Sequence, residues 1–162
     1  MSQRIIIVGG PRRGKSTLAN DLALGYRLYP GTHAARTSSA PIRCGDPLSK
    51  VKEPRDGVEY LPEGIPISGD DGAAQWVADN WFTLPGPWVC EGWVMARALR
   101  RWASMHWDER HGRVLRAPAD RIIVLDRPAW VESSKGQEAM HRAVMTVWNS
   151  IAHNFQTITK ER

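Results

Sequence analysis

The chain of 162 residues has a mass of 18.2 kDa, enough for one hydrophobic core and too little for two ordinary domains. Hydrophobic residues make up 42% and charged residues 24%, close to globular averages, which excludes intrinsically disordered and fibrous classes. Lys and Arg outnumber Asp and Glu by 22 to 17, and the resulting net charge of +5 favours polyanionic partners. A single basic domain over residues 1–162 is therefore expected.

Targeting and redox signals are weak in this sequence. No apolar run approaches the roughly 18 residues of a membrane span, and the four apolar residues before Gly9 are too few for a signal peptide. The two cysteines, Cys44 and Cys90, cannot form a disulfide framework, and no Cys/His spacing of the zinc type surrounds them. The expected location is the cytoplasm, with both thiols reduced and no membrane partner. The oligomeric state is left open.

The N-terminal apolar run, residues 5–8, is entirely β-branched and stops at two glycines, a pattern typical of a strand buried on both faces of a parallel sheet. A helix is expected from Ser16, because Leu18, Leu22 and Tyr26 recur every four residues.

The next segment predicts a second, short strand at residues 40–44, followed by a turn at 45–47. Between positions 47 and 72 there are eight Gly or Pro, which predicts a long surface excursion with little regular structure. Asp70 or Asp71 can cap a helix over residues 73–81.

The second half repeats the order of strand and helix. Residues 88–90 form a buried run that ends at Glu91-Gly92, and helical spacing follows through Met95, Leu99 and Trp102. Another buried run, residues 122–125, ends at Asp126. Ser134 and Gln137 fit a capping box for a helix whose buried face is Met140, Val144, Val147, Ile151 and Phe155. Residues 156–160 are either a further strand or a frayed helix end. This alternation predicts an α/β fold with a parallel sheet flanked by helices.

Residues 9–17 match the phosphate-loop pattern G-x-x-x-x-G-K-[ST], between a predicted strand and a predicted helix. Glycines let backbone N–H groups turn inward around a phosphate, and the helix N-terminus adds unpaired amides. Lys15 is expected to reach the β- and γ-phosphates, and Ser16 to offer its hydroxyl to Mg²⁺. A turn that merely caps a helix would carry Lys and Ser there only by accident. The predicted nucleotide-binding residues are Gly10, Pro11, Arg12, Arg13, Gly14, Lys15, Ser16, Thr17 and Arg127.

The chain resembles the P-loop kinases of the nucleoside and nucleotide kinase superfamily. Adenylate kinases are similar at the phosphate loop, at Gly45-Asp46 and at Glu91-Gly92, landmarks that span about half the chain. The resemblance implies a single-domain P-loop three-layer sandwich that binds ATP, or another NTP, with Mg²⁺.

Two departures separate the chain from ordinary adenylate kinases. The D-G-F-P-R arrangement of that family is replaced by Glu91-Gly92-Trp93-Val94-Met95-Ala96-Arg97, in which the arginine is displaced by two positions. The short lid expected at residues 127–137 offers few basic residues, namely Arg127, Lys135 and Arg142 nearby. The chain looks more like small hydroxyl kinases, such as polynucleotide kinases and phage kinases that phosphorylate 5-hydroxymethyluracil within DNA. A phage origin would put it in the host cytoplasm.

Three carboxylates follow predicted strands. The resemblance to hydroxyl kinases implies that Asp46 is the catalytic base, although a turn-forming Asp before Pro47 is the alternative. Glu91 is expected to orient Mg²⁺ or to hold the acceptor, the alternative being a helix-capping acid. Asp126 competes with Glu91 for the metal. Arg127 is expected to clamp the γ-phosphate or stack on adenine, unless it forms a surface salt bridge.

An arginine-rich segment between positions 97 and 116 is interleaved with tryptophans, a combination that suits a nucleic-acid strand. Core packing explains Trp102 equally well. The arginines are Arg97, Arg100, Arg101, Arg110, Arg113 and Arg116, and the other tryptophans are Trp93 and Trp107. The predicted acceptor-binding residues are Arg43, Asp46, Trp93, Arg97, Arg100 and Arg101.

These patterns predict a kinase that moves the γ-phosphate of ATP to a hydroxyl on a nucleotide or, more specifically, on DNA with a modified base. The first alternative is a kinase for a nucleoside monophosphate or another small alcohol. The second is a nucleotide-binding regulatory module without catalytic activity.

Overall fold

The computed structural model describes residues 3–24, 41–47, 59–61, 65, 72–129, 132–156 and 158–161. Among these, the side chains at 20, 23–24, 41–47, 59–60 and 158–161 are not described. Within the described ranges, no helix combines the length and the apolar character that a membrane span requires.

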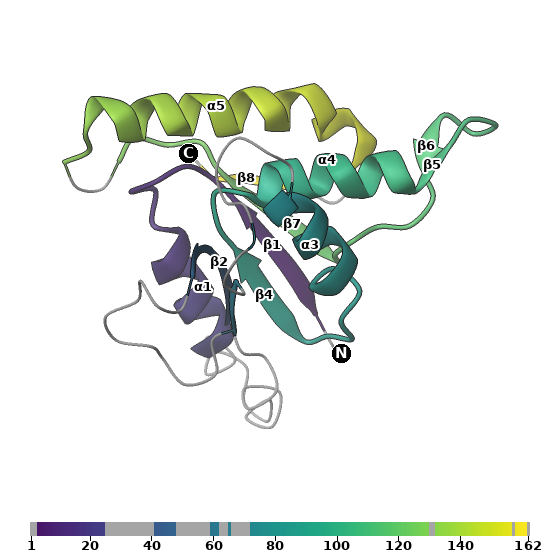
Figure 1. Ribbon diagram of the computed structural model, residues 1–162, viewed down its shortest axis with the longest axis horizontal. Coiled ribbons are helices and arrows are strands. Elements are labelled where there is room, and N and C mark those ends of the chain that lie inside the picture. Colours follow the sequence, from purple (N-terminus) through teal and green to yellow (C-terminus); the bar gives the residue numbers. More distant parts are fainter. Residues whose placement is uncertain are drawn as a thin grey trace.

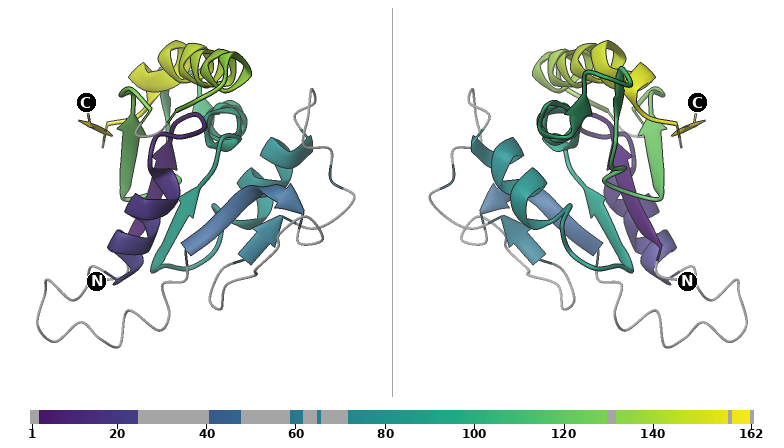
Figure 2. Two further views of the ribbon diagram at one scale, coloured as in Figure 1. Left: turned by 90° about the vertical axis from the view of Figure 1, so that its left-hand side faces the viewer. Right: turned by 90° about the vertical axis from the view of Figure 1, so that its right-hand side faces the viewer.

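A six-stranded parallel sheet forms the centre of the molecule, with the strand order β3-β2-β4-β1-β7-β8. Figure 1 shows the strands crossing the middle of the molecule, and Figure 2 shows them fanned out from β7 to β2 and β3. The bounds are β1 Arg4–Val8, β2 Pro41–Pro47, β3 Glu59–Leu61, β4 Trp88–Glu91, β7 Arg121–Leu125 and β8 Ile158–Glu161.

Helices cover both faces of the sheet, because alternate residues of each buried strand point to opposite sides. Ile6, Cys90 and Ile122 belong to the larger core cluster, which the helices α3, α4 and α5 share. Ile5, Val89 and Ile123 pack on the other face against α1. Burial on both faces explains the unbroken β-branched runs of β1 and β7. The helix bounds are α1 Lys15–Leu24, α3 Gly72–Asn80, α4 Met95–Met105, α5 Lys135–Ile151 and the 3₁₀ helix η3 Ala152–Asn154.

The register brings the carboxyl ends of three strands together. In β1, Ile7 lies opposite Glu91 of β4, and Val8 lies opposite Val124 of β7. The loop that leaves β1 therefore begins between Glu91 on one side and Asp126 on the other. Parallel α/β sheets bind ligands at this edge.

The parallel α/β class and most predicted elements are confirmed. The strand at β4 and the helix at α4 follow the predicted spacing, and α5 begins with the predicted capping box between Ser134 and Gln137. Residues 158–161 form the strand β8, which decides between the two alternatives for the C-terminal segment.

Two predicted boundaries are wrong, those of the second strand and of the last helix. The strand β2 continues through the predicted turn to Pro47. The predicted excursion at 47–72 contains the short strand β3, whose Leu61 is fully buried. The segment expected as a lid, 127–137, includes the first residues of α5, which starts at Lys135, and its role as a lid stays a prediction. The last prediction placed Phe155 on the helix face, but α5 ends at Ile151 because the chain tightens there into η3.

The hairpin after α4 was not predicted. A two-stranded antiparallel hairpin, β5 Trp107–Asp108 and β6 Arg113–Val114, follows α4. Figure 1 shows it projecting at the opposite end of the molecule from α1.

Candidate active site

The predicted phosphate loop, residues 9–17, has an unusual backbone conformation. Arg12 has a φ of 61° and Gly14 a φ of 81°, both in the left-handed region. A glycine adopts this conformation without steric cost, whereas an arginine does so only when its surroundings impose it. The helix α1 starts directly after Gly14, so that its first amides point toward the loop, where they can serve an anion.

Lys15 lies across the loop that precedes it. Its Nζ donates to the carbonyl oxygen of Gly10 at 2.5 Å. The residue as a whole is half-buried. It can exchange a carbonyl for phosphate oxygens with a small rotation of a flexible side chain, as the sequence motif predicts.

Ser16 and Glu91 meet at the carboxyl ends of β1 and β4. The hydroxyl of Ser16 donates to Oε1 of Glu91 at 3.0 Å, and Glu91 is only 3% exposed. The pair fits Mg²⁺ by donor chemistry, because hydroxyl and carboxylate oxygens are ligands for this ion. Among the residues that the structure describes, no group of three or more His, Cys, Asp or Glu could hold a metal. A cation here would be completed by phosphate and water oxygens, which is the usual pattern for Mg²⁺.

On the other side of the loop, Arg127 follows β7. Its Nε donates to the backbone oxygen of Arg13 at 3.1 Å, so it ties the end of β7 to the loop. The role predicted for Arg127 on the γ-phosphate stays a prediction. Asp126 lies 3.3 Å, Oδ1 to Nε2, from His141 of α5. Ser16 donates its hydrogen bond to Glu91.

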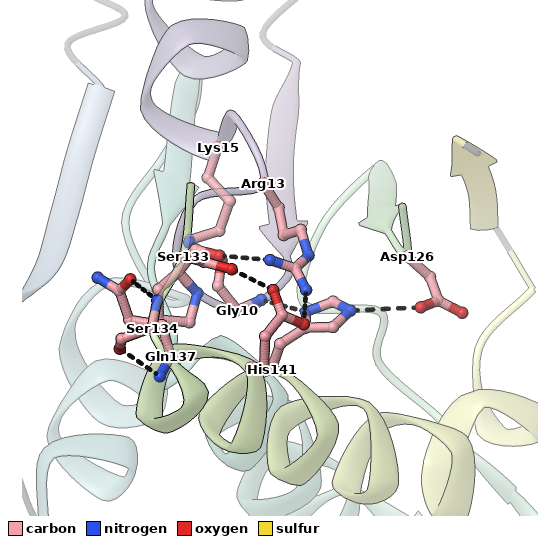
Figure 3. Close-up of polar contacts among 10 residues, drawn as sticks. Gly10, Arg13, Lys15, Asp126, Ser133, Ser134, Gln137 and His141 are labelled. Carbon is pink, nitrogen blue, oxygen red and sulfur yellow. Dashed lines mark hydrogen bonds and ion pairs between the residues drawn. The ribbon is translucent and has the colours of Figure 1, made fainter. Parts of the chain in front are cut away.

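The helix α5 approaches the loop at Gly10. The backbone N–H of Gly10 donates to Nδ1 of His141 at 3.0 Å, and Figure 3 shows the imidazole between Gly10 and Asp126. A Cβ atom at position 10 would lie 2.4 Å from Cα of His141. Position 10 therefore requires glycine for the approach of a helix, a reason that the phosphate motif did not reveal.

The side chain of Arg13 points away from the open part of the loop, so its predicted nucleotide contact stays a prediction for the backbone amide alone. Its side chain is 2% exposed, and its guanidinium donates to Glu138 at 2.7 Å and to the carbonyl of Pro11 at 3.0 Å (Figure 3). The hydrogen bond from Arg13, supported by one from Ser133, lowers the pKa of Glu138. Arg13 can thus offer a nucleotide its backbone amide, while its charge is directed to α5.

The acceptor-side residues are described less fully. Asp46 is the last residue but one of β2, two strands from β1 in the sheet. Arg43 lies on the same strand, paired in register with Glu91. Their side chains lie outside the described part of the structure, so their predicted roles stay predictions.

The structure divides the arginine-rich segment. Trp93 is partly buried: it packs against the core and lines a small pocket beside α5, and its predicted role toward the acceptor stays a prediction. Trp102 is buried and donates to the carbonyl of Arg116, which is the core role that the sequence left open. Trp107 is 43% exposed on the hairpin.

The arginines of this segment lie at different distances from the loop. Arg97 is in the first turn of α4, and Arg100 and Arg101 follow one turn later. The other three, Arg110, Arg113 and Arg116, are exposed on or beside the hairpin. The helix α4 begins at the carboxyl edge of the sheet and has 11 residues, which correspond to a length of about 16 Å. The hairpin at its other end is therefore about 16 Å from that edge.

A cavity of about 340 Å³ also lies away from the phosphate loop. It is bounded by the hairpin strand β6, the residues that follow it and η3, with Arg113, Ile122, His153 and Phe155 among its lining.

Sequence reasoning missed Glu138 and His141. A signal was present, because His141, Val144, Met145 and Trp148 follow the i, i+3, i+4, i+7 spacing of a buried helix face. That face was predicted with Met140 in place of His141, whereas Met140 is 42% exposed. A histidine on a buried face requires a partner, and here the partners are Gly10 and Asp126.

The fold establishes a class, a small α/β protein with a parallel sheet flanked by helices. No protein-family model matches the chain, and comparisons with curated proteins and with solved structures find no match either.

Proposed function

We propose that this chain is a P-loop phosphotransferase with a three-layer sandwich fold, which moves the γ-phosphate of ATP, or of another NTP, to a hydroxyl group. The observation that carries the proposal is the 3.0 Å hydrogen bond between Ser16 and Glu91. This bond joins two residues that are 75 positions apart in the sequence. Ser16 was expected to bind Mg²⁺ because of the motif, and Glu91 because of its place at the end of a strand.

In this proposal the loop holds the triphosphate through its backbone amides, and Lys15 moves from the Gly10 carbonyl to the phosphate oxygens. Ser16 and Glu91 hold Mg²⁺, which would neutralise negative charge on the phosphates. Asp46 accepts the proton of the acceptor hydroxyl. The oxygen of that hydroxyl bonds to the γ-phosphorus as the bond between the γ-phosphorus and the leaving diphosphate breaks. Arg127, next to the loop, stabilises the charge of the transferred group.

For the acceptor we propose DNA with a hydroxymethylated base, of which 5-hydroxymethyluracil is the example that the resemblance to phage kinases supplies. The net charge of +5 and the exposed arginines of the hairpin support a polyanionic acceptor. A DNA strand that reached both the hairpin and the phosphate loop would have to follow α4 for about 16 Å.

A second candidate is a kinase for a nucleoside monophosphate or another small alcohol. The distance between the hairpin and the loop favours it, because a small acceptor bound near Asp46 and Arg97 would not reach Arg110 or Arg113.

The test is transfer of labelled γ-phosphate from ATP to nucleosides, nucleotides, DNA ends and hydroxymethylated DNA. We expect Lys15→Ala to abolish transfer while the protein stays folded, because the ammonium stabilises charge rather than packing. Arg142→Ala, which removes an exposed cation from α5, is the control.

Activity of Lys15→Ala within about tenfold of wild type, or about 1.4 kcal/mol of barrier, would contradict the phosphate-loop assignment. Nucleotide binding without transfer to any acceptor would instead favour a regulatory module.

A further inference from the structure

The helix α5 contacts the phosphate loop at two points that the motif does not require. Glu138 pairs with Arg13 in the middle of the loop, and His141, one helical turn later, receives the N–H of Gly10 at its start. We call these two side chains the α5 clamp. It joins positions 131 residues apart in the sequence.

The contact at Gly10 defines the protonation state of His141. A backbone N–H can only donate, so Nδ1 must accept with its lone pair and carry no proton. In a neutral imidazole the proton is then on Nε2, where it can be donated to Oδ1 of Asp126 at 3.3 Å. If the imidazole were protonated, the N–H at Nδ1 would face the N–H of Gly10, and the hydrogen bond between them would be lost.

The charged groups around His141 agree with a neutral ring. Burial, followed by the positive charge of Arg13, lowers the pKa of His141, although Asp126 and Glu138 oppose this. The loop lysine, Lys15, bonds to the carbonyl of the same Gly10. Gly10 thus donates its N–H to His141 and accepts a hydrogen bond from Lys15 at its carbonyl oxygen.

We propose that His141 is a positioning residue of the phosphate loop: its neutral imidazole, oriented by Asp126, holds Gly10 so that the loop and Lys15 are preorganised for a nucleoside triphosphate. The ligand half of this inference rests on the proposed function. His141 itself is not expected to touch the nucleotide, because its ring nitrogens face Gly10 and Asp126.

Two conservative substitutions separate the two hydrogen bonds. His141→Asn places an amide oxygen near the position of Nδ1, where it can accept from Gly10. His141→Gln places its amide near the position of Nε2, where it can donate to Asp126 but cannot accept from Gly10. Both remove the ring, so a role in packing alone predicts the same result for both variants. His153→Asn and His153→Gln, at an exposed histidine of η3, are the matched controls.

The first measurement is hydrogen exchange of the Gly10 amide in the ligand-free protein. We expect protection to be retained in His141→Asn and lost in His141→Gln, and ¹⁵N shifts of the wild-type imidazole to report a proton on Nε2. Equal exchange in the two variants, or a proton on Nδ1 in the wild type, would overturn the proposal. The imidazole shifts require no variant to fold.

The second measurement is ATP affinity in the presence of Mg²⁺. His141→Gln should bind about three- to tenfold more weakly than His141→Asn, the range expected for one hydrogen bond. Equal affinities would overturn the positioning role. If wild type binds no ATP, the proposed function fails together with the ligand half of the inference, whereas the exchange measurement still decides whether His141 holds Gly10.

Discussion

Two adjacent glycines of the phosphate loop differ in what surrounds them. A Cβ atom at Gly9 would lie 3.2 Å from the carbonyl oxygen of Leu125, a contact that a small shift relieves. At Gly10 it would lie 2.4 Å from Cα of His141, which cannot move without the helix α5. The motif itself ranks them in the opposite order, since Gly9 is its first invariant position and Gly10 a variable one.

We therefore expect Gly10→Ala to destabilise the protein more than Gly9→Ala. Overpacking against a helix backbone costs about 1–3 kcal/mol, and Gly10→Ala should reach or exceed this range. Urea denaturation of both variants measures the difference. The opposite order would mean that α5 does not approach the loop as closely as this structure has it.

His141 also predicts a pH dependence of stability. Its pKa is lowered from an ordinary value of 6.5, chiefly by burial, so the unfolded chain binds its proton at a higher pH than the folded one. The stabilisation is fully present above pH 6.5 and is lost as the pH falls toward the lowered pKa. Three carboxyl groups also have lowered pKa values, those of Asp108, Asp120 and Glu138. Their protonation changes the free energy of unfolding only near and below pH 4.5, which is a more acidic range than that of His141.

The measurement is the free energy of unfolding between pH 8 and pH 5 for wild type and His141→Asn. Wild type should lose stability through this window, and the variant should lose less. Parallel curves would show that His141 is as easily protonated in the folded protein as in the unfolded chain.

At the scale of elements, the hairpin after α4 is the part of the arginine-rich segment best placed for a polyanion. Arg110 and Arg113 are exposed there beside Trp107, while Arg116 is engaged with Trp102, 5.6 Å above the ring centroid. The hairpin escaped prediction because its strands have two residues each. Its turn is formed by Gly112, whose φ of 58° suits glycine, and by the contacts of Asp108 with Arg110 and His111.

If DNA is the acceptor, the double variant Arg110→Ala, Arg113→Ala should reduce the slope of log K against log salt by about one for each DNA phosphate that the protein no longer neutralises. ATP affinity should not change, because the hairpin lies about 16 Å of helix from the loop. DNA affinity between low and moderate salt is the measurement, with Arg142→Ala as the control. Unchanged slopes, or no DNA binding at low salt, would favour a small acceptor.

At the scale of the whole molecule, the strand order separates the three carboxylates expected from the sequence. β4 and β7 flank β1, so Glu91 and Asp126 lie on opposite sides of the phosphate loop. Asp46, on β2, is one strand further out on the side of Glu91. This order supports a metal role for Glu91 and an acceptor role for Asp46.

The division of roles predicts different phenotypes. Asp46→Asn should lower turnover by roughly two to four orders of magnitude with ATP affinity little changed, as expected for loss of a general base. Glu91→Gln should raise the Mg²⁺ concentration required for activity. Steady-state kinetics with varied ATP and Mg²⁺ distinguish them. Collapse of ATP binding in Asp46→Asn would assign Asp46 to the metal instead.

Features that depend on neighbours in the chain were predictable from the sequence. The strands β1, β4 and β7 and the capping box of α5 follow from local periodicity and from residue types at fixed spacing. The phosphate-loop motif is a local pattern of the same kind, and its role in binding a nucleotide stays a prediction. The prediction that Glu91 lies where a strand ends is also confirmed. Acids at strand ends gather at one edge of a parallel sheet.

Contacts between distant segments were decided only by the tertiary structure. Neither the motif nor the helical pattern required that Gly10 receive α5, that Arg13 be buried against Glu138, or that the hairpin lie away from the loop. Such contacts depend on how whole faces of the sheet and helices pack, and a local pattern contains no information about the partner it will meet. The residues of the loop match a local sequence motif, whereas the second role of Gly10 depends on the helix that packs against it.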